Sequence, residues 1–185
     1  MTNFQAYMRM KGGRMKLKHK VVIGSIVLLI FSYLLWTQRP VNIIGAGSKI
    51  KYDPASAPEF NVCNDRNFGA YDIVVNHLAL TEWGRIHWYL EHKDELRKKY
   101  GIPSCDSWII NFWDIGGGFT DIKTSGDSDL YCFPPIKESE KHCIEKNILM
   151  HVDFDAGFYE RFSFSDSDYY WITMPDGKLL RIKTP

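Results

Sequence analysis

The sequence predicts an α+β fold, in which a single apolar helix near the N-terminus precedes a small domain with one main helix packed on an antiparallel sheet. Three observations lead to this prediction. Residues 21–36 form an uncharged run. Residues 81–100 repeat apolar side chains at helical spacing, as in an amphipathic helix. After Gly101, short β-branched and aromatic segments alternate with turn residues, which favours strands.

The uncharged run favours one transmembrane helix. As a helix it spans about 24 Å, against about 30 Å for the hydrocarbon core of a bilayer. Six cations precede the run and only Arg39 follows it. The positive-inside rule then places the N-terminus in the cytoplasm and the rest of the chain across the membrane. The predicted parts are a basic cytoplasmic tail at residues 1–20, a transmembrane anchor at residues 21–38 and an exported domain at residues 39–185.

Two alternatives compete with this anchor. A cleaved signal peptide needs small residues just after its apolar run, whereas residues 36–40 read Trp-Thr-Gln-Arg-Pro and are bulky and charged. A buried core helix fits poorly behind a cluster of cations. Met15 opens a compact basic segment, so that both Met1 and Met15 are candidate translation starts.

The charge distribution also divides the chain at Pro40. Residues 1–40 hold seven Lys and Arg residues and no Asp or Glu, while residues 41–185 hold the other 16 basic residues and all 22 acidic ones. The two parts therefore carry formal charges of +7 and −6, although the whole chain carries only +1. An acidic domain lacks the basic footprint that nucleic-acid binding needs, so we expect no nucleic-acid partner.

The elements of the domain are expected in the following order. A strand opens it at residues 41–52, and a second strand at residues 71–78 precedes the main helix. Thr81 is a good N-cap for this helix, and Gly101 ends it. One apolar stripe is expected on it, formed by Trp83, Ile86, Leu90, Leu96 and Tyr100, with Tyr89 on its edge. Further strands are expected at residues 108–113, 130–133, 148–154, 159–164, 169–174 and 178–182, and one or two helical turns at residues 137–146.

All four cysteines lie in the exported part. An even number of cysteines in an oxidising compartment predicts two disulfides. We favour Cys132–Cys143, because the ten residues between them close a compact local loop, and Cys63–Cys105 then follows by elimination. Zinc binding is the alternative, but the sequence has no Cys-x2-Cys or His-x3-His pair.

Several short stretches together form a recognisable pattern. The most specific are Phe112-Trp113-Asp114-Ile115-Gly116 and Cys143-Ile144-Glu145-Lys146-Asn147. The others are Arg39-Pro40-Val41, Leu80-Thr81, Gly84-Arg85-Ile86, Trp88-Tyr89-Leu90, Lys98-Lys99-Tyr100-Gly101-Ile102-Pro103, Leu130-Tyr131-Cys132-Phe133 and Leu149-Met150. From about Met15 to its C-terminus, the chain resembles the enterobacterial putative inner-membrane protein family, domain of unknown function 943. The resemblance implies a single-pass protein of the bacterial inner membrane with a periplasmic C-terminal domain. It supports the Cys132–Cys143 pairing and supplies no activity.

Known catalytic and ligand-binding patterns are missing from the sequence. It has no His-Glu-x-x-His motif and no Gly-x-Ser-x-Gly elbow. The turn at residues 114–118 lacks the Lys-Ser/Thr of a phosphate-binding loop, and the Asp-x-Asp pairs lack the terminal Glu of an EF-hand. We therefore expect no catalytic residue, no cofactor and no metal, and a protein that is not an enzyme.

The leading functional hypothesis is a membrane-held domain that binds another protein, one form being an immunity-type protein that neutralises an envelope toxin. An aromatic and acidic segment is the expected partner surface, because exposed Tyr beside Asp is a common binding composition. Its residues are Phe158, Tyr159, Asp166, Asp168, Tyr169 and Tyr170. Two alternatives remain: an envelope enzyme or small-ligand module that uses the 114–118 turn, and an accessory subunit that associates through the membrane helix.

Overall fold

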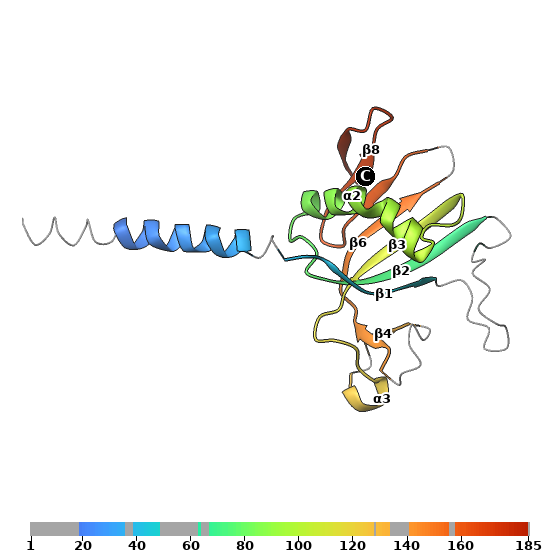
Figure 1. The fold of residues 1–185 in the computed structure, drawn as a ribbon, viewed down its shortest axis with the longest axis horizontal. Helices are drawn as coiled ribbons and strands as arrows, with labels where there is room; N and C mark the ends of the chain where they lie inside the picture. Colours follow the sequence, from blue (N-terminus) through green and yellow to red (C-terminus); the bar gives the residue numbers. More distant parts are fainter. Residues whose placement is uncertain are drawn as a thin grey trace, which may run out of the picture. The chain divides into compact units, whose positions relative to one another are not determined.

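The chain forms two compact units, Met1–Pro40 and Val41–Pro185. The computed structural model describes residues 19–35, 39–48, 63, 67–127, 129–133, 141–155 and 158–184. Figure 1 shows the units in the order of the sequence, and each is described by itself below.

The first unit contains one helix, at residues 19–35. All its side chains are exposed, and none between Val21 and Leu35 is charged. The expected anchor at residues 21–38 coincides with this helix as far as Leu35, while residues 36–38 lie outside the described residues. Within the part of the chain that is described, no helix is both long enough and apolar enough to cross a membrane.

The second unit is built on a seven-stranded sheet with the order β1-β2-β3-β6-β7-β8-β9. Its strands are β1 (Asn42–Ser48), β2 (Phe68–Asn76), β3 (Ser107–Asp114), β6 (Ile148–Phe154), β7 (Arg161–Ser163), β8 (Tyr169–Thr173) and β9 (Leu179–Lys183). A strand is present at each place where the sequence predicts one, although residues 49–52 of the first expected strand lie outside the described residues. The prediction of an antiparallel sheet is wrong for one pair of strands, because β2 and β3 are parallel. Helix α2 (Glu82–Tyr100) supplies the crossover connection that parallel neighbours require.

Helix α2 begins and ends where the sequence predicts. The Thr81 hydroxyl accepts a hydrogen bond from the Gly84 amide, and Gly101 ends the helix in the left-handed conformation at φ 66°. The predicted stripe is wrong in two places. Tyr89 is not at its edge but at its centre, packed edge-on against Phe112 and Phe162. Trp83 is mostly exposed instead of buried.

The opposite face of the sheet is partly covered by a two-stranded sheet, β4 (Leu130–Cys132) and β5 (Cys143–Glu145). A second apolar cluster joins the two sheets, with Val74, Trp113, Phe133 and Ile144 at its centre. The short helix α3 (Ile122–Ser125) leads into this hairpin. The prediction of one or two helical turns at residues 137–146 is wrong for the part of this range that the structure describes, residues 141–146. Cys143 is drawn into a strand by its pairing with Cys132, and residues 134–140 lie outside the described residues.

Candidate functional site

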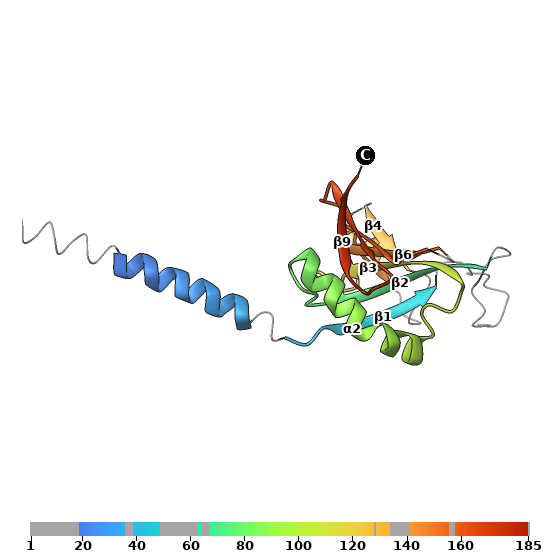
Figure 2. The same cartoon turned by 90° about the horizontal axis from the view of Figure 1, so that it is seen from above.

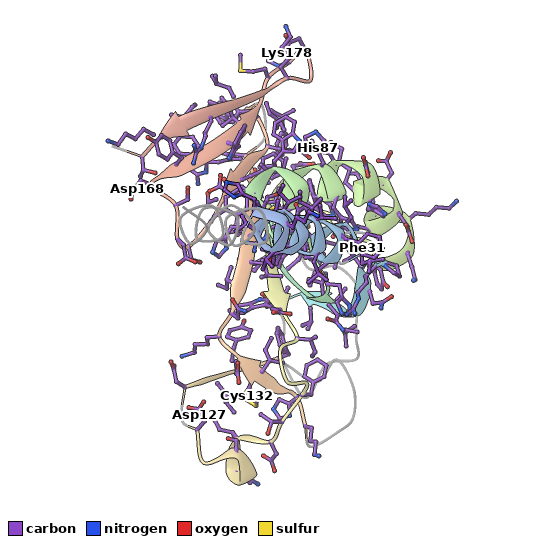
Figure 3. The ribbon with its side chains drawn as sticks, turned by 90° about the vertical axis from the view of Figure 1, so that its left-hand side faces the viewer. Phe31, His87, Asp127, Cys132, Asp168 and Lys178 are labelled. Atoms are coloured by element: carbon purple, nitrogen blue, oxygen red, sulfur yellow. A yellow bond between two sulfur atoms is a disulfide. The ribbon has the colours of Figure 1, made fainter. Side chains whose placement is uncertain are left out.

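The predicted partner surface is divided by strand β7. Phe158 and Tyr159 precede this strand, are 70% and 42% exposed, and contact each other edge-on. Asp166 and Asp168 follow it, in the turn that leads to β8 (Figure 3). The two aspartates therefore lie on a turn and not on one strand face, and the six residues do not form one continuous patch.

The two adjacent tyrosines of the predicted surface occupy opposite faces of β8. Tyr169 lies under the Arg181 guanidinium at 4.1 Å, and Tyr170 lies near that of Arg161 at 5.9 Å. Strand neighbours point in opposite directions, so one of the two could have faced solvent. Both are instead half-buried, and an arginine from a neighbouring strand, Arg161 of β7 or Arg181 of β9, lies over each ring.

Glu160, the residue that follows Tyr159 in the sequence, lines a groove of the domain, here named the far-end groove. Its lining residues are Tyr89, Lys93, Asp94, Arg97, Pro103, Trp108, Phe154 and Glu160. They come from α2, the segment after it, β3, the end of β6 and the segment before β7. The Trp108 and Phe154 rings stack at 5.8 Å and form an aromatic wall.

The polar groups of the far-end groove are arranged around the Glu160 carboxylate. The Tyr89 hydroxyl donates a hydrogen bond to it at 3.4 Å, and the Lys93 ammonium forms an ion pair with it at 3.1 Å. Burial and the charge of Glu160 raise the pKa of Tyr89, so that its hydroxyl remains a donor. Within the described ranges the exposed Arg97 guanidinium has no hydrogen-bond or ion-pair partner. The groove thus combines an aromatic wall with a cation available to a ligand.

A second exposed apolar group lies at the start of α2, and we name it the entry edge. It consists of Leu80 and Trp83, which are 58% and 52% exposed. The Trp83 ring packs at a tilt of 38° against the His87 ring, with centroids 4.1 Å apart, and meets Trp171 edge-on at 5.7 Å. These contacts hold the indole in a fixed position while leaving half of it bare.

Glu82 supports the entry edge from beneath. Its carboxylate accepts a hydrogen bond from Trp171 Nε1 at 2.8 Å and lies 3.7 Å from an Arg181 nitrogen. Burial raises the pKa of Glu82, but the hydrogen bonds from Trp171 and Ser167 and the Arg181 charge outweigh it. The pKa of Glu82 therefore lies below its ordinary value, and the side chain is ionised at neutral pH.

The cysteines form two disulfides, Cys63–Cys105 and Cys132–Cys143, which are the pairs that the sequence favoured. Cys132 and Cys143 lie directly opposite each other in the β4–β5 sheet, with Cα atoms 3.9 Å apart (Figure 3). Cys105 Sγ lies 3.1 Å from the buried Tyr71 hydroxyl, in the segment between α2 and β3. Each disulfide thus secures a loop or a hairpin that is otherwise held by few strand contacts.

Comparison with known protein families identifies the family of this chain. The family model described as enterobacterial putative membrane protein, DUF943, matches residues 16–183. The chain belongs to this family. No curated protein and no solved structure matches the chain. The DUF943 match includes the helix of residues 19–35 and every strand of the domain, and the family description gives a membrane protein without an activity.

Sequence reasoning missed one feature of this DUF943 protein, a buried polar network on the face opposite α2. Asp72 is 3% exposed, and its carboxylate accepts hydrogen bonds from Trp113 Nε1 at 2.7 Å, Asn111 Nδ2 at 3.0 Å and the Tyr131 hydroxyl at 3.1 Å. His151 Nδ1 in turn contacts Asn111 Oδ1 at 2.8 Å. The available signal was a lone Asp and a lone Asn within two otherwise apolar strands. Because three donors surround a carboxylate closed to solvent, the network clamps the β4–β5 hairpin to the sheet.

The remaining ligand-like groups of the DUF943 domain have structural partners. The sulfur atoms of Cys132 and Cys143 lie within 4.8 Å of a His142 ring nitrogen, but the two sulfurs are bonded to each other. In the 114–118 turn, the Asp114 carboxylate accepts a hydrogen bond from the Gly116 amide. Asp153 forms an ion pair with Arg161 at 3.0 Å. The far-end groove and the entry edge therefore remain as the candidate binding regions.

Proposed function

We propose that this protein is a bitopic inner-membrane protein, anchored by residues 21–38, whose periplasmic domain binds another protein at the far-end groove. The observation that carries the proposal is the exposed Phe158–Tyr159 pair, next in sequence to a groove with an aromatic wall and an arginine that has no ion-pair partner among the described residues. We also propose that the domain acts by binding and not by catalysis, since the one deeply buried carboxylate among its described residues, that of Asp72, is enclosed by three donors.

The anchor is supported by the exposure and sequence of the first helix. From Val21 to Leu35 it presents uncharged, mainly aliphatic side chains on all sides, and all of them are exposed. Exposed apolar surface of this kind is unfavourable in water and favourable in a bilayer. The preceding cations set the orientation, and two disulfides suit the oxidising periplasm.

Protein binding is supported by the composition of the far-end groove. Binding hot spots are enriched in Trp, Tyr and Arg, and they occur where a side chain of one partner fills a pocket of the other. Phe158 can enter a pocket of the partner, and a partner side chain can lie against Trp108 and Phe154. Arg97 at the rim is placed to pair with a partner carboxylate. These features favour a protein partner over a small polar ligand.

Neutralisation of an envelope toxin is one form of this proposal. The exported part carries a formal charge of −6, which would accelerate its association with a basic toxin domain. Association that becomes slower as salt rises would support this form, because added ions screen charges more than about 10 Å apart at 0.1 M. Salt-independent association would leave the groove as the site and exclude a basic toxin as the partner.

Photo-crosslinking in cells tests the proposal. A crosslinking amino acid at position 158 should capture a discrete protein, while the same amino acid at Glu95, an exposed position of α2 outside the groove, should not. Adding Arg97→Glu to the position-158 chain should abolish the crosslink. Equal capture from both positions, or capture that persists with Arg97→Glu, would reject the groove. A partner lost only when the membrane helix is exchanged would indicate an accessory subunit instead.

A further inference from the structure

We infer that the far-end groove receives the C-terminal residue of its protein partner, with the terminal carboxylate paired to Arg97 and a large apolar side chain against Trp108 and Phe154. This inference rests on the proposed function and names the part of the partner that enters the groove. The partner is thereby a protein whose last residue is apolar and accessible.

The first argument is the distribution of charge along α2. Tyr89, Lys93 and Arg97 follow one another at intervals of four residues, so they form one stripe on the helix. The Glu160 carboxylate accepts hydrogen bonds from Tyr89 and Lys93. Arg97 lies one turn further along and has no hydrogen-bond or ion-pair partner within the described residues. An anion is therefore the group that would complete this stripe.

The other charges of the groove restrict where this anion lies. Asp94 also lines the groove and is exposed, so it repels a partner carboxylate, while Arg97 attracts it. The Arg97 charge reaches the polar groups of the groove. Burial raises the pKa of Tyr89 most, the Glu160 charge adds to this rise, and the Arg97 charge opposes it. A carboxylate beside Arg97 can form the two parallel hydrogen bonds that a guanidinium offers.

The second argument is the size of the groove. Its volume is about 210 Å³, whereas a cavity of about 150 Å³ already holds a benzene molecule. The groove thus accepts one large side chain and a small polar group, but not a longer stretch of chain. Trp108 on β3 and Phe154 on β6 provide its apolar side. Figure 2 shows α2 lying along one face of the sheet, so the charged stripe and the aromatic wall belong to facing elements.

The third argument distinguishes a chain end from an acidic side chain. In an extended segment, successive side chains point to opposite sides, and those on the same side are roughly 7 Å apart. An internal Asp or Glu beside an apolar residue would therefore send only one of the two groups into so small a groove. A C-terminal residue carries its carboxylate and its side chain on the same Cα atom, so both groups enter together. Capture of a terminal carboxylate is also a recurring mode of peptide recognition.

Fluorescence anisotropy of labelled peptides tests the inference on the purified full chain. The first probe is fluorescein-Gly-Gly-Gly-Phe with a free carboxylate, and the second is the same peptide with a C-terminal amide. We expect amidation to weaken binding about tenfold or more, because the charge-assisted pair with Arg97 is lost. A third probe, the amide of fluorescein-Gly-Gly-Asp-Phe, offers a side-chain carboxylate and should bind no better than the second. Replacing the final Phe of the free acid by Gly should weaken binding to a similar extent.

Variants of the protein assign the effect to Arg97. Arg97→Gln should weaken binding of the free acid about tenfold and leave binding of the amide unchanged. Lys98→Gln is the matched control, because Lys98 is the next residue, is exposed and does not line the groove, so it should change neither affinity. Asp94→Asn should strengthen binding of the free acid, since it removes a like charge. Near-ultraviolet circular dichroism of each variant checks that the fold is retained.

The outcomes separate this inference from the proposed function. Equal affinity for the free acid and either amide, or no binding of any peptide at about 1 mM protein, overturns the chain-end inference. Protein binding at the groove then still stands if the crosslink from position 158 in cells depends on Arg97, and an internal segment of the partner occupies the groove. Carboxylate-dependent peptide binding without a crosslink from position 158 supports the inference and rejects the surface around Phe158. Absence of both results rejects both proposals.

Discussion

The entry edge and the far-end groove use opposite ends of α2 and present apolar groups in different ways. At the entry edge, Leu80 and Trp83 are each more than half exposed. At the other end, Trp108 and Phe154 form the wall of a groove whose rim carries charges. An exposed apolar surface suits an extended partner, whereas a groove suits a partner with a defined shape. Exposure of aromatic residues alone does not distinguish these roles.

The largest expected effect tests whether the two ends are independently supported. Replacing Cys63 and Cys105 together by Ser opens a loop of 42 residues, which should cost about 4 kcal/mol in the chain-entropy model. The disulfide borders the segment that supplies Pro103 to the far-end groove. We therefore expect loss of partner crosslinking from position 158, measured alongside urea unfolding. Unchanged crosslinking at an undiminished urea midpoint would show that the groove does not depend on this bond.

The matched comparison is the other disulfide. Replacing Cys132 and Cys143 together by Ser should cost less, about 3 kcal/mol, because the sequence separation is only 11 residues. The β4–β5 hairpin takes no part in either end of α2, so crosslinking at position 158 should be retained in the protein that remains folded. Selective loss of the groove in this variant would mean that the two faces of the sheet are coupled.

The second prediction concerns the buried network beneath both ends. Asp72→Ala should lower the free energy of unfolding by about 3 kcal/mol, because the Trp113, Asn111 and Tyr131 donors lose their acceptor in a site closed to water. Chemical denaturation measures the loss. Glu95→Ala, at an exposed position of α2, is the control and should change stability by less than about 0.5 kcal/mol. A loss below about 1 kcal/mol would mean that the network does not clamp the hairpin.

The third prediction separates the two ends directly. Phe158→Ala should weaken partner binding about tenfold, as for a central hot-spot residue, with little change in stability because the ring is largely in solvent. Trp83→Phe should leave partner binding unchanged. Titration of the captured partner against both variants measures this. If the two substitutions weakened partner binding equally, the two regions would belong to one binding surface.

The smallest expected effect concerns the charge that supports the entry edge. Trp171→Phe removes a hydrogen bond to the Glu82 carboxylate and should move the pKa of Glu82 upward. In the native protein the lowered pKa means that ionised Glu82 favours folding. This contribution is complete above the unfolded pKa and disappears as pH falls through the lower, folded pKa. The stability difference between the two proteins, at most about 1 kcal/mol for a pair near the surface, should be present at pH 7 and vanish in acid.

Urea unfolding of both proteins at neutral and acidic pH gives this comparison. A difference that is the same at every pH would come from lost packing of the Trp171 ring on Trp83 and not from the Glu82 charge. The variant Glu82→Gln is the control, because it removes the titration and leaves the indole in place.

The sequence specified local features of the fold better than long-range ones. Helix α2 was predicted with both ends, because Thr81 and Gly101 act on the residues beside them. The parallel pairing of β2 with β3 was missed, since strand order depends on contacts between segments more than 30 residues apart. The burial of Tyr89 was likewise decided by Phe162, which lies on a distant strand.

The candidate site shows the same difference between local and long-range features. Phe158 and Tyr159 could be named from composition, because an exposed aromatic pair is a local property. The far-end groove could not, because its lining comes from α2, β3, the end of β6 and the segment before β7. The Asp72 network was also out of reach, since Asp72 lies on β2 and its donors lie on β3 and β4.

The antiparallel pairing of β1 with β2 has a mechanical consequence. Strand β1 is an edge strand bonded only to β2, and the chain reaches it at Asn42. If the domain is held at its far end while the chain is pulled at Asn42 along the strand, the load runs parallel to β1. The hydrogen bonds that β1 forms with β2 between Asn42 and Ser48 are then loaded together in shear, and they do not break one after another. The irregularity between Ile43 and Gly45 lies at the pulled end, so slippage would begin there.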